Sequence, residues 1–546
     1  MFTLHDDRGT DPTRIRTIAG IDEGFALFDY VSIKQNDGEE WIAQVVVPNL
    51  NISTVGDPLN PTILHGLQLS QQRPDIRSIE SIQVFSLMVL GQVRNGQIIT
   101  ARLRPLPGSN VRRLDSQETI RIIGIPSLSK DLNKSNAIGR LLNAENVPLC
   151  ITREMLNYHF MVVGGTGSGK SDASANLVAQ AVRMEKCVLI HDVKPDYRLL
   201  RNSNSETVVK HVWKQVEEYG LAPYGMEDVL HIGFHGLCDP SDVDAVVGFQ
   251  SSDFNPDLLA ALFFGSSGNE SLQYDGFAAA AHALDELRES GDARFSGGYT
   301  LNDILEEVRN RNTSPPSPQA AIATATANAI ARKVGTRRRN LPWLDAVGKP
   351  TGSTRTAAGS PFTIPAQQTT VQRFNLGSSA KSGRIILIDY GHYDDDAAYA
   401  LILSWFLREA QTYRKQRGDA PIVQLIDEAH RVFDNRSRHS QTLERDFNRA
   451  MREGRSVDHS LILSLQNASQ IPPGVMNNLN SKIIMKQNNA MVAKAATQTM
   501  GEEFAEQSMR LGVGQALVSF HESKAVVLAQ IAPSPFDLMR PDNSSR

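Results

Sequence analysis

Cysteine is scarce in this sequence, and long apolar runs are missing from it. Its three cysteines, Cys150, Cys187 and Cys238, are too few for a disulfide framework and lack the spacing of a metal site. No stretch approaches the roughly 18 apolar residues that cross a membrane, and the first residues lack the apolar core of a secretory signal. We therefore expect a cytoplasmic protein without a membrane partner.

An excess of positive charge is missing as well. The chain has 56 lysines and arginines against 60 aspartates and glutamates, so its formal net charge is −4. This balance excludes a generally basic nucleic-acid binder, and any contact with DNA has to use a local cluster or a channel formed by several subunits. The 13 histidines are scattered, and we find no residue constellation typical of a nuclease, a protease or a metal centre.

The most specific motif is HFMVVGGTGSGKS at 159–171. An apolar run, a glycine-rich turn and a helical pattern follow one another, which is the strand–loop–helix order of a phosphate-binding loop. Glycines let backbone N–H groups curl around phosphate oxygens, and the N-terminus of the next helix adds partial positive charge. The predicted triphosphate-binding residues are Gly165, Thr166, Gly167, Ser168, Gly169, Lys170, Ser171 and Asp172.

Two side chains of this loop have separate predicted roles. Lys170 can reach the β- and γ-phosphates of ATP, and the Ser171 hydroxyl can ligate Mg²⁺. The alternative is an ordinary glycine-rich turn before a helix, which the flanking strand and helix patterns disfavour. We therefore predict ATP and Mg²⁺ as cofactors.

A second motif supplies acidic side chains. The apolar stretch that begins at Ile422 ends in Asp427 and Glu428. In phosphate-loop enzymes such an acid at the end of a core strand holds Mg²⁺, which suits Asp427, and Glu428 can act as general base toward the attacking water. An acidic pair at a strand end is also common on surfaces, so the upstream phosphate loop is what favours the catalytic interpretation.

Two further elements follow these acids. The apolar stretch 460–465 ends in Gln466, a candidate sensor of the γ-phosphate, although a glutamine in a turn is the alternative. Before it, helical spacing places several arginines on one face. Most of them can form a solvated basic face, but Arg455 and Arg452 are candidate arginine fingers that reach the triphosphate of a neighbouring subunit.

The hydrophobic pattern predicts two kinds of fold along the chain. Short stretches rich in β-branched and aromatic residues fill about 15–125 and predict a small β-barrel, with a sandwich as the alternative. A linker is expected at 124–146. From Pro148 strands and helices alternate, as in a parallel sheet covered by helices. The predicted division is therefore a barrel with linker at 1–146, an α/β ATPase domain at 147–531 and a tail at 532–546. Within the second domain we expect a mostly helical insertion at about 207–340 and a flexible loop at about 344–370.

Five stretches in this order resemble the HerA branch of the HerA–FtsK ATPases. They are the run 139–171 with the phosphate loop at its end, LIDEAH at 425–430, REGRS at 452–456, SLQNASQIP at 464–472 and GVGQALVSF at 512–520. The resemblance covers most of the chain and implies a RecA-like P-loop ATPase core behind a small N-terminal β-barrel. The chain departs from the family pattern after its second core strand, where Asp192 is followed by Val-Lys-Pro-Asp-Tyr, so a role for Asp192 is left open.

The same resemblance implies partners. It points to a homohexameric ring with ATP between subunits and double-stranded DNA in the centre. Archaeal relatives act with the nuclease NurA in DNA end processing, and bacterial relatives are often paired with a nuclease or a sirtuin-like effector in anti-phage defence. The basic residues at 332–339 are candidates for a DNA channel, with a solvated helix end as the alternative.

Three functions remain in competition on sequence grounds. The first is a ring-forming, ATP-driven translocase on double-stranded DNA that works with a partner nuclease or effector. The second is an ATPase scaffold that assembles and regulates a toxic effector without moving along DNA. The third is an ordinary helicase, suggested only by the letters DEAH at 427–430, and no second-domain helicase motifs follow to support it. On this view His430 is a surface or interface residue.

Overall fold

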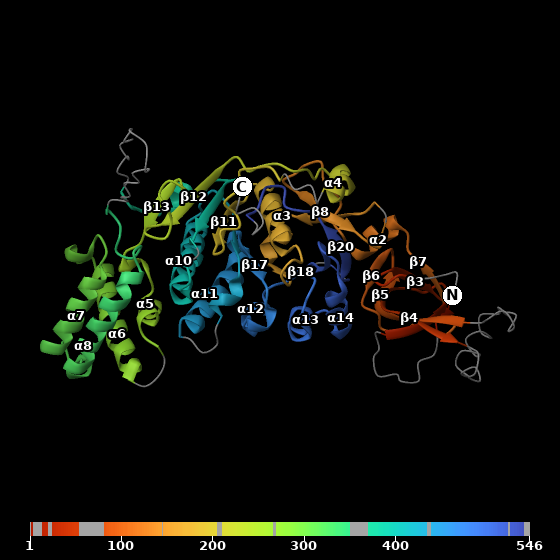
Figure 1. Cartoon of the computed structure of the whole chain (residues 1–546). Helices are drawn as coiled ribbons and strands as arrows, with labels where there is room; N and C mark the ends of the chain where they lie inside the picture. The colour runs from red at the N-terminus through yellow and green to blue at the C-terminus, as the bar shows by residue number, and fades with distance from the viewer. Residues whose placement is uncertain are drawn as a thin grey trace.

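The computed structural model describes most of the chain. The described residues are 2–3, 14–19, 25–53, 81–144, 146–204, 210–265, 269–349, 370–391, 393–433, 438–521, 523 and 525–539. A small β-barrel, a large mixed sheet and a group of helices follow one another across the molecule, with the barrel and the helical group at opposite ends (Figure 1). Among the described residues no helix is both long and apolar enough to cross a membrane.

The first part of the chain forms the barrel. Its strands are β1 (Phe2–Thr3), β2 (Arg14–Ala19), β3 (Tyr30–Lys34), β4 (Glu40–Ser53), β5 (Ser81–Arg94), β6 (Gln97–Ile99) and β7 (Asn110–Arg113). Pairing runs β2-β1-β7-β3-β4-β5, and β5 pairs back with β2, which closes the sheet. Alternate side chains such as Ile33, Trp41 and Phe85 point inward and are fully buried. The predicted β-barrel is confirmed, and the sandwich alternative is wrong.

The expected linker at 124–146 is only partly correct. Helix α2 (Ser116–Ile123) ends at Gly124, which takes the left-handed conformation that favours glycine. Beyond it, β8 (Ser135–Leu141) pairs with β9 (Pro148–Thr152) and with a strand from the far end of the chain. The pattern of serines and asparagines in this segment resembles a loop, but long-range pairing makes part of it a sheet strand.

The large sheet has 13 strands. In spatial order they are β14 (Gln372–Arg373), β13 (Ala245–Gly248), β12 (Val229–Phe234), β15 (Ile385–Asp389), β11 (Cys187–Asp192), β16 (Ile422–Ile426), β17 (His459–Leu465), β10 (Phe160–Val163), β18 (Ser481–Met485), β19 (Gln515–Ser519), β20 (Val527–Ile531), β8 and β9. Neighbours from β14 to β18 are parallel, and those from β18 to β9 are antiparallel. The parallel part is the RecA-like core, so the predicted α/β fold class is confirmed.

Helices cover both faces of the parallel part. They include α3 (Lys170–Arg183), α9 (Leu376–Ser379), α10 (Asp396–Lys415), α11 (Arg438–Gly454), α12 (Pro473–Met476), α13 (Ala490–Thr497) and α14 (Glu502–Arg510). Phe160 and Val162 of β10 belong to the apolar cluster that contains α3, whereas Met161 and Val163 belong to the cluster that contains α10 and α11. This two-sided burial explains why the core strands are continuous apolar runs.

The insertion expected at about 207–340 is helical only in part. One short helix, α4 (Lys210–Val216), comes first. Strands β12 and β13 follow and join the large sheet, and the remaining part consists of helices. The helices are α5 (Pro256–Phe263), α6 (Asn269–Glu289), α7 (Leu301–Thr313) and α8 (Thr324–Arg337). Of the loop expected at 344–370, residues 350–369 lie outside the described part. In the tail expected at 532–546, Phe536 is buried and bridges to Ser203, so the described residues of this tail belong to the folded core.

Candidate nucleotide-binding site

The carboxyl ends of β10, β11, β16 and β17 meet at one edge of the sheet because these strands are neighbours and parallel. A cavity of about 480 Å³ opens at this edge. Ligands of open α/β sheets bind outside the carboxyl ends of the strands. The cavity is lined by Gly165, Thr166, Gly167, Gly169, Lys170, Ser171, Asp172, Lys194, Asp196, Glu428, Gln466, Val513, Leu538 and Met539.

The phosphate loop has the backbone that its glycines predict. Gly167 and Gly169 have φ of 75° and 96°, in the left-handed region that favours glycine. A Cβ on Gly165 would come within 2.5 Å of the Asn488 side-chain amide, so a larger residue here would have to displace that side chain. Helix α3 begins without a side-chain cap. Its first N–H groups are therefore available to phosphate oxygens at the positive end of the helix dipole.

Lys170 extends from α3 into a buried cluster of acids. Its Nζ lies 3.2 Å from Asp427 Oδ1, 3.5 Å from Glu428 Oε1 and 2.9 Å from Ser464 Oγ. Burial lowers the pKa of Lys170, but the two carboxylates outweigh burial and leave its pKa above the ordinary value. Lys170 therefore stays protonated in the cavity.

Asp427 is almost completely buried beneath the cavity. Burial raises the pKa of its carboxyl, but Lys170 and the Ser464 hydroxyl, which donates at 2.6 Å, reverse this effect and leave the pKa below the ordinary value. An acid that is ionised and close to the phosphate loop is the oxygen ligand that Mg²⁺ prefers. Ser464 was not among the predicted site residues.

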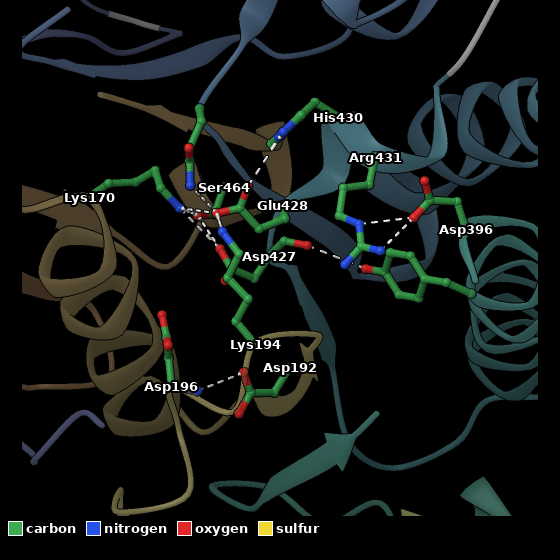
Figure 2. A network of polar contacts seen from close by, with 12 residues as sticks. Lys170, Asp192, Lys194, Asp196, Asp396, Asp427, Glu428, His430, Arg431 and Ser464 are labelled. Atoms are coloured by element: carbon green, nitrogen blue, oxygen red, sulfur yellow. Dashed lines mark hydrogen bonds and ion pairs between the residues drawn. The ribbon is translucent and has the colours of Figure 1, made fainter. Parts of the chain in front are cut away.

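Glu428 is the point where most of the polar groups converge. Its backbone has φ of 49°, an uncommon conformation for a side chain of this size. Gln466 Nε2 donates to Glu428 Oε1 at 2.6 Å, and Lys194 Nζ lies 3.0 Å from the same oxygen. Lys170, Lys194 and His430 approach the two carboxylates from different sides (Figure 2). The structure thus brings Glu428 and Gln466 together, as expected for a base and a sensor that act on one phosphate.

His430, expected to be a surface or interface residue, is largely buried within its own chain. Its side chain is 18% exposed, and Nε2 lies 3.5 Å from Glu428 Oε2. Burial lowers the pKa of His430 although Glu428 raises it. The residue after it, Arg431, forms ion pairs with Asp394 and Asp396 at the start of α10. The turn that follows the acids is therefore held by packing and ion pairs on both sides.

Lys194 and Asp196 line the cavity although no sequence motif marked them as site residues. Both follow β11, the strand next to β16, and the buried Asp192 fixes their turn by accepting the N–H groups of Asp196 and Tyr197 at 3.1 and 3.0 Å. Burial, and to a smaller extent Asp427, raise the pKa of Asp196 to about 6. Their place directly after a core strand was the signal that could have found them.

Apolar side chains complete the wall of the cavity. Val513 comes from the GVGQ stretch before β19, and Leu538 and Met539 come from the end of the described chain. Val513 is 73% exposed. No local pattern marks the last two residues, because they reach the cavity only through the packing of the tail.

The two candidate arginine fingers lie elsewhere. Arg455 follows α11, and its guanidinium stacks over the Tyr158 ring at 4.1 Å and donates to the Tyr158 hydroxyl. Arg452 donates to the Asn448 carbonyl at 3.2 Å and is exposed. Tyr158 precedes β10, so these contacts are at the amino-terminal edge of the sheet, opposite the phosphate loop. Neither arginine can touch the cavity of its own chain, and a role in a neighbouring subunit stays a prediction.

The basic residues at 332–339 are largely engaged within the molecule. Lys333 forms an ion pair with Glu270. Arg337 donates to both oxygens of Asp395 at 2.9 and 2.8 Å, and Arg338 donates to an asparagine of α7. These contacts tie α8 to α6, α7 and the start of α10. A role of this cluster in a DNA channel also stays a prediction.

A second cavity of about 520 Å³ adjoins the first and shares Gly169, Asp172 and Val513 with it. The further lining includes apolar and amide side chains such as Met485, Gln515, Gln530 and Ile531, together with Arg140 and His211. Nucleotide sites are mostly apolar clefts with a few placed polar groups. The two cavities together therefore have the character of a phosphate site joined to a nucleoside site.

The donor set fits Mg²⁺ bound together with a triphosphate. Among the described residues no group of three or more His, Cys, Asp or Glu side chains is placed to hold a metal ion. Ser171 lines the cavity and Asp427 lies beneath it. Mg²⁺ is commonly held by one or two protein oxygens together with substrate phosphates and water. Ser171 and Asp427 match that pattern.

Comparison with known proteins gives consistent matches. The family model described as "Helicase HerA, central domain" matches residues 136–410. The DNA double-strand break repair helicase HerA of Sulfurisphaera tokodaii is 21% identical over 90% of this chain and 85% of its own length. A probable HerA of Methanocaldococcus jannaschii is 22% identical over 80% and 82%. Among solved structures, the bacterial conjugative coupling protein TrwB matches with a TM-score of 0.47 and 11% identity over 79% of this chain and 94% of that chain.

Proposed function

The chain belongs to the family described as "Helicase HerA, central domain", and from this premise we propose that it is a ring-forming ATPase that moves along double-stranded DNA. ATP is the substrate, and Mg²⁺ is the cofactor. The ring is a homohexamer with the nucleotide between subunits. The same proposal includes the domain division given above, with the first boundary moved to between Gly124 and Ser135 because β8 belongs to the large sheet.

The observation that carries the ATPase proposal is the convergence at Glu428. Two ammonium groups, from α3 and the turn after β11, meet an amide that follows β17 and a carboxylate that follows β16 at the wall of one cavity next to a glycine-rich loop. Phosphoryl transfer requires mainly positioning and charge stabilisation, which such a cluster provides.

Each residue then has a defined task. The loop N–H groups from Gly165 to Gly169 hold phosphate oxygens, and Lys170 neutralises charge on the β- and γ-phosphates. Ser171 and Asp427 hold Mg²⁺, which stabilises the charge that develops on the phosphate oxygens. Glu428 accepts the proton of the attacking water, Gln466 senses the γ-phosphate, and the nucleoside lies in the second cavity.

The DNA part of the proposal has separate support. Two relatives align with this chain over more than four-fifths of their own length. One is described as a DNA double-strand break repair helicase and the other as a probable one. Because Arg452 and Arg455 lie at the amino-terminal edge, their proposed arginine-finger role requires a neighbouring subunit and is part of the ring proposal. We extend the proposal to a partner nuclease or sirtuin-like effector, with a role in DNA end processing or anti-phage defence. The three free cysteines suit the reducing cytoplasm.

The test measures ATP hydrolysis and particle mass together, with and without linear double-stranded DNA, at low and moderate salt. We expect a hexamer whose hydrolysis rises with DNA and whose DNA binding weakens as salt increases. Lys170→Ala should lose nucleotide binding and serves as the inactive control. A hexamer with DNA-independent hydrolysis would contradict the translocase and favour an ATPase scaffold that regulates an effector.

A further inference from the structure

Two lysines among the described residues line the nucleotide cavity, and only Lys170 belongs to the phosphate-loop motif. The other, Lys194, follows β11. Both ammonium groups reach the same atom, because Glu428 Oε1 lies 3.5 Å from Lys170 Nζ and 3.0 Å from Lys194 Nζ. Gln466 donates to this oxygen as well, at 2.6 Å. Three donors around a single oxygen form a site that an oxygen of another anion could occupy equally well.

The two lysines differ in how firmly they are held. The side chain of Lys170 is 8% exposed and also contacts Asp427 and Ser464. The side chain of Lys194 is 49% exposed, and Glu428 is its ion-pair partner. Only the Lys194 end of this ion pair is exposed, because the Glu428 side chain is 4% exposed. Lys170 and Gln466 remain at Glu428 Oε1 when the ammonium group of Lys194 leaves, so the buried carboxylate keeps a cation and an amide as partners.

The backbone that carries Lys194 is fixed, in contrast to its side chain. Asp192 is fully buried and accepts the N–H groups of Asp196 and Tyr197. The N–H group of Met539 donates to the Asp196 carbonyl at 2.8 Å. A rigid turn with a flexible four-carbon stem lets the ammonium group move within the cavity while its Cα stays in place.

We propose that Lys194 is a γ-phosphate contact that is held by Glu428 until a triphosphate enters the cavity. This inference rests on the proposed ATPase function. When the γ-phosphate enters, the ammonium group of Lys194 leaves Glu428 Oε1 and pairs with a phosphate oxygen. Glu428 is thereby released to accept a proton from water. ADP lacks the γ-phosphate, so Lys194 stays on Glu428 when ADP is bound.

The experiment compares the affinities of the full chain for a non-hydrolysable ATP analogue and for ADP. The variants are Lys194→Ala and Lys194→Arg, with Lys415→Ala as matched control. Lys415 is a 43% exposed lysine that also pairs with one carboxylate, Glu453, away from the cavity. Lys194→Ala should weaken binding of the analogue roughly tenfold, as the loss of a charge-assisted contact predicts, and change ADP affinity by less than about twofold. Lys194→Arg should retain most of the analogue affinity.

Each other outcome has a defined meaning. An equal loss for the analogue and for ADP would show that Lys194 only supports the shape of the site, and would overturn the inference. Unchanged affinity for both nucleotides would overturn it as well. Unimpaired binding of both nucleotides by Lys170→Ala would instead contradict the nucleotide site itself. A thermal unfolding midpoint close to that of wild type verifies that each variant is folded.

Discussion

The two edges of the parallel sheet carry charge in different ways. At the carboxyl edge Lys170, Asp427 and Glu428 are buried and contact one another. At the amino edge Arg452 and Arg455 are exposed and contact a carbonyl or a tyrosine. Charges interact strongly where water is excluded and weakly where it is not. The carboxyl edge therefore concentrates interacting charges inside one chain, whereas the arginines at the amino edge are accessible from outside it.

The largest expected effect is on ATP hydrolysis and comes from removing an arginine at the amino edge, which would act on the carboxyl edge of a neighbouring subunit. Arg455→Ala should lower ATP hydrolysis by about 1000-fold without weakening nucleotide binding, because an arginine finger acts only on the transition state. Mixed rings of Arg455→Ala and Lys170→Ala subunits should regain part of the activity, since each supplies what its neighbour lacks. The measurement is steady-state hydrolysis by single and mixed variants.

Arg449→Ala is the matched control for this prediction. Arg449 lies on α11, the helix that Arg455 follows, is 60% exposed and pairs with Glu453 at 3.3 Å. Its removal should leave hydrolysis near the wild-type rate. If Arg455→Ala and Arg452→Ala both hydrolyse ATP as fast as wild type, the amino edge has no part in catalysis.

A smaller effect on hydrolysis is expected at the carboxyl edge, where the base can be removed without removing the nucleotide-binding groups. Glu428→Gln keeps the shape of the side chain but removes the base, so hydrolysis should fall roughly 100-fold while ATP binding is retained. Equilibrium binding of ATP and single-turnover hydrolysis measure the two properties separately. Loss of binding in this variant would show that Glu428 supports the site structurally and is not its base.

The smallest effect concerns the pH dependence of stability at the carboxyl edge. Burial raises the pKa of Asp196 to about 6, so the folded chain binds a proton more tightly than the unfolded chain. Stability from this group is present at pH 4 and is lost as pH rises toward 6 and above. Asp196→Asn cannot ionise, so relative to wild type its thermal midpoint should rise by about 2 °C between pH 4 and pH 7.5. Parallel midpoints for both proteins would contradict the raised pKa.

Local motifs predicted much of the site. The residues from Gly165 to Asp172 and the pair Asp427 and Glu428 each follow from what a loop or strand end needs, and all but Ser168 and Asp427 line the cavity. Gln466 also lies where the pattern placed it. Lys194, Ser464 and Met539 were not predicted. Lys194 and Ser464 reach the site through the order of strands in the sheet, and Met539 reaches it through the packing of the tail. No short stretch of sequence determines either feature.

The fold, like the site, has features that the sequence determined and features that only the tertiary structure decided. Apolar periodicity, glycine spacing and β-branched residues determined a barrel followed by an α/β core with a phosphate loop, because these features depend on neighbours in sequence. Only the tertiary structure decided that 135–141 joins the large sheet, that two strands interrupt the predicted helical insertion, and that the arginines lie opposite the nucleotide cavity. The two strand placements depend on pairing between segments far apart in sequence, β8 with β20 and β12 with β15, where burial and backbone hydrogen bonding outweigh local preference.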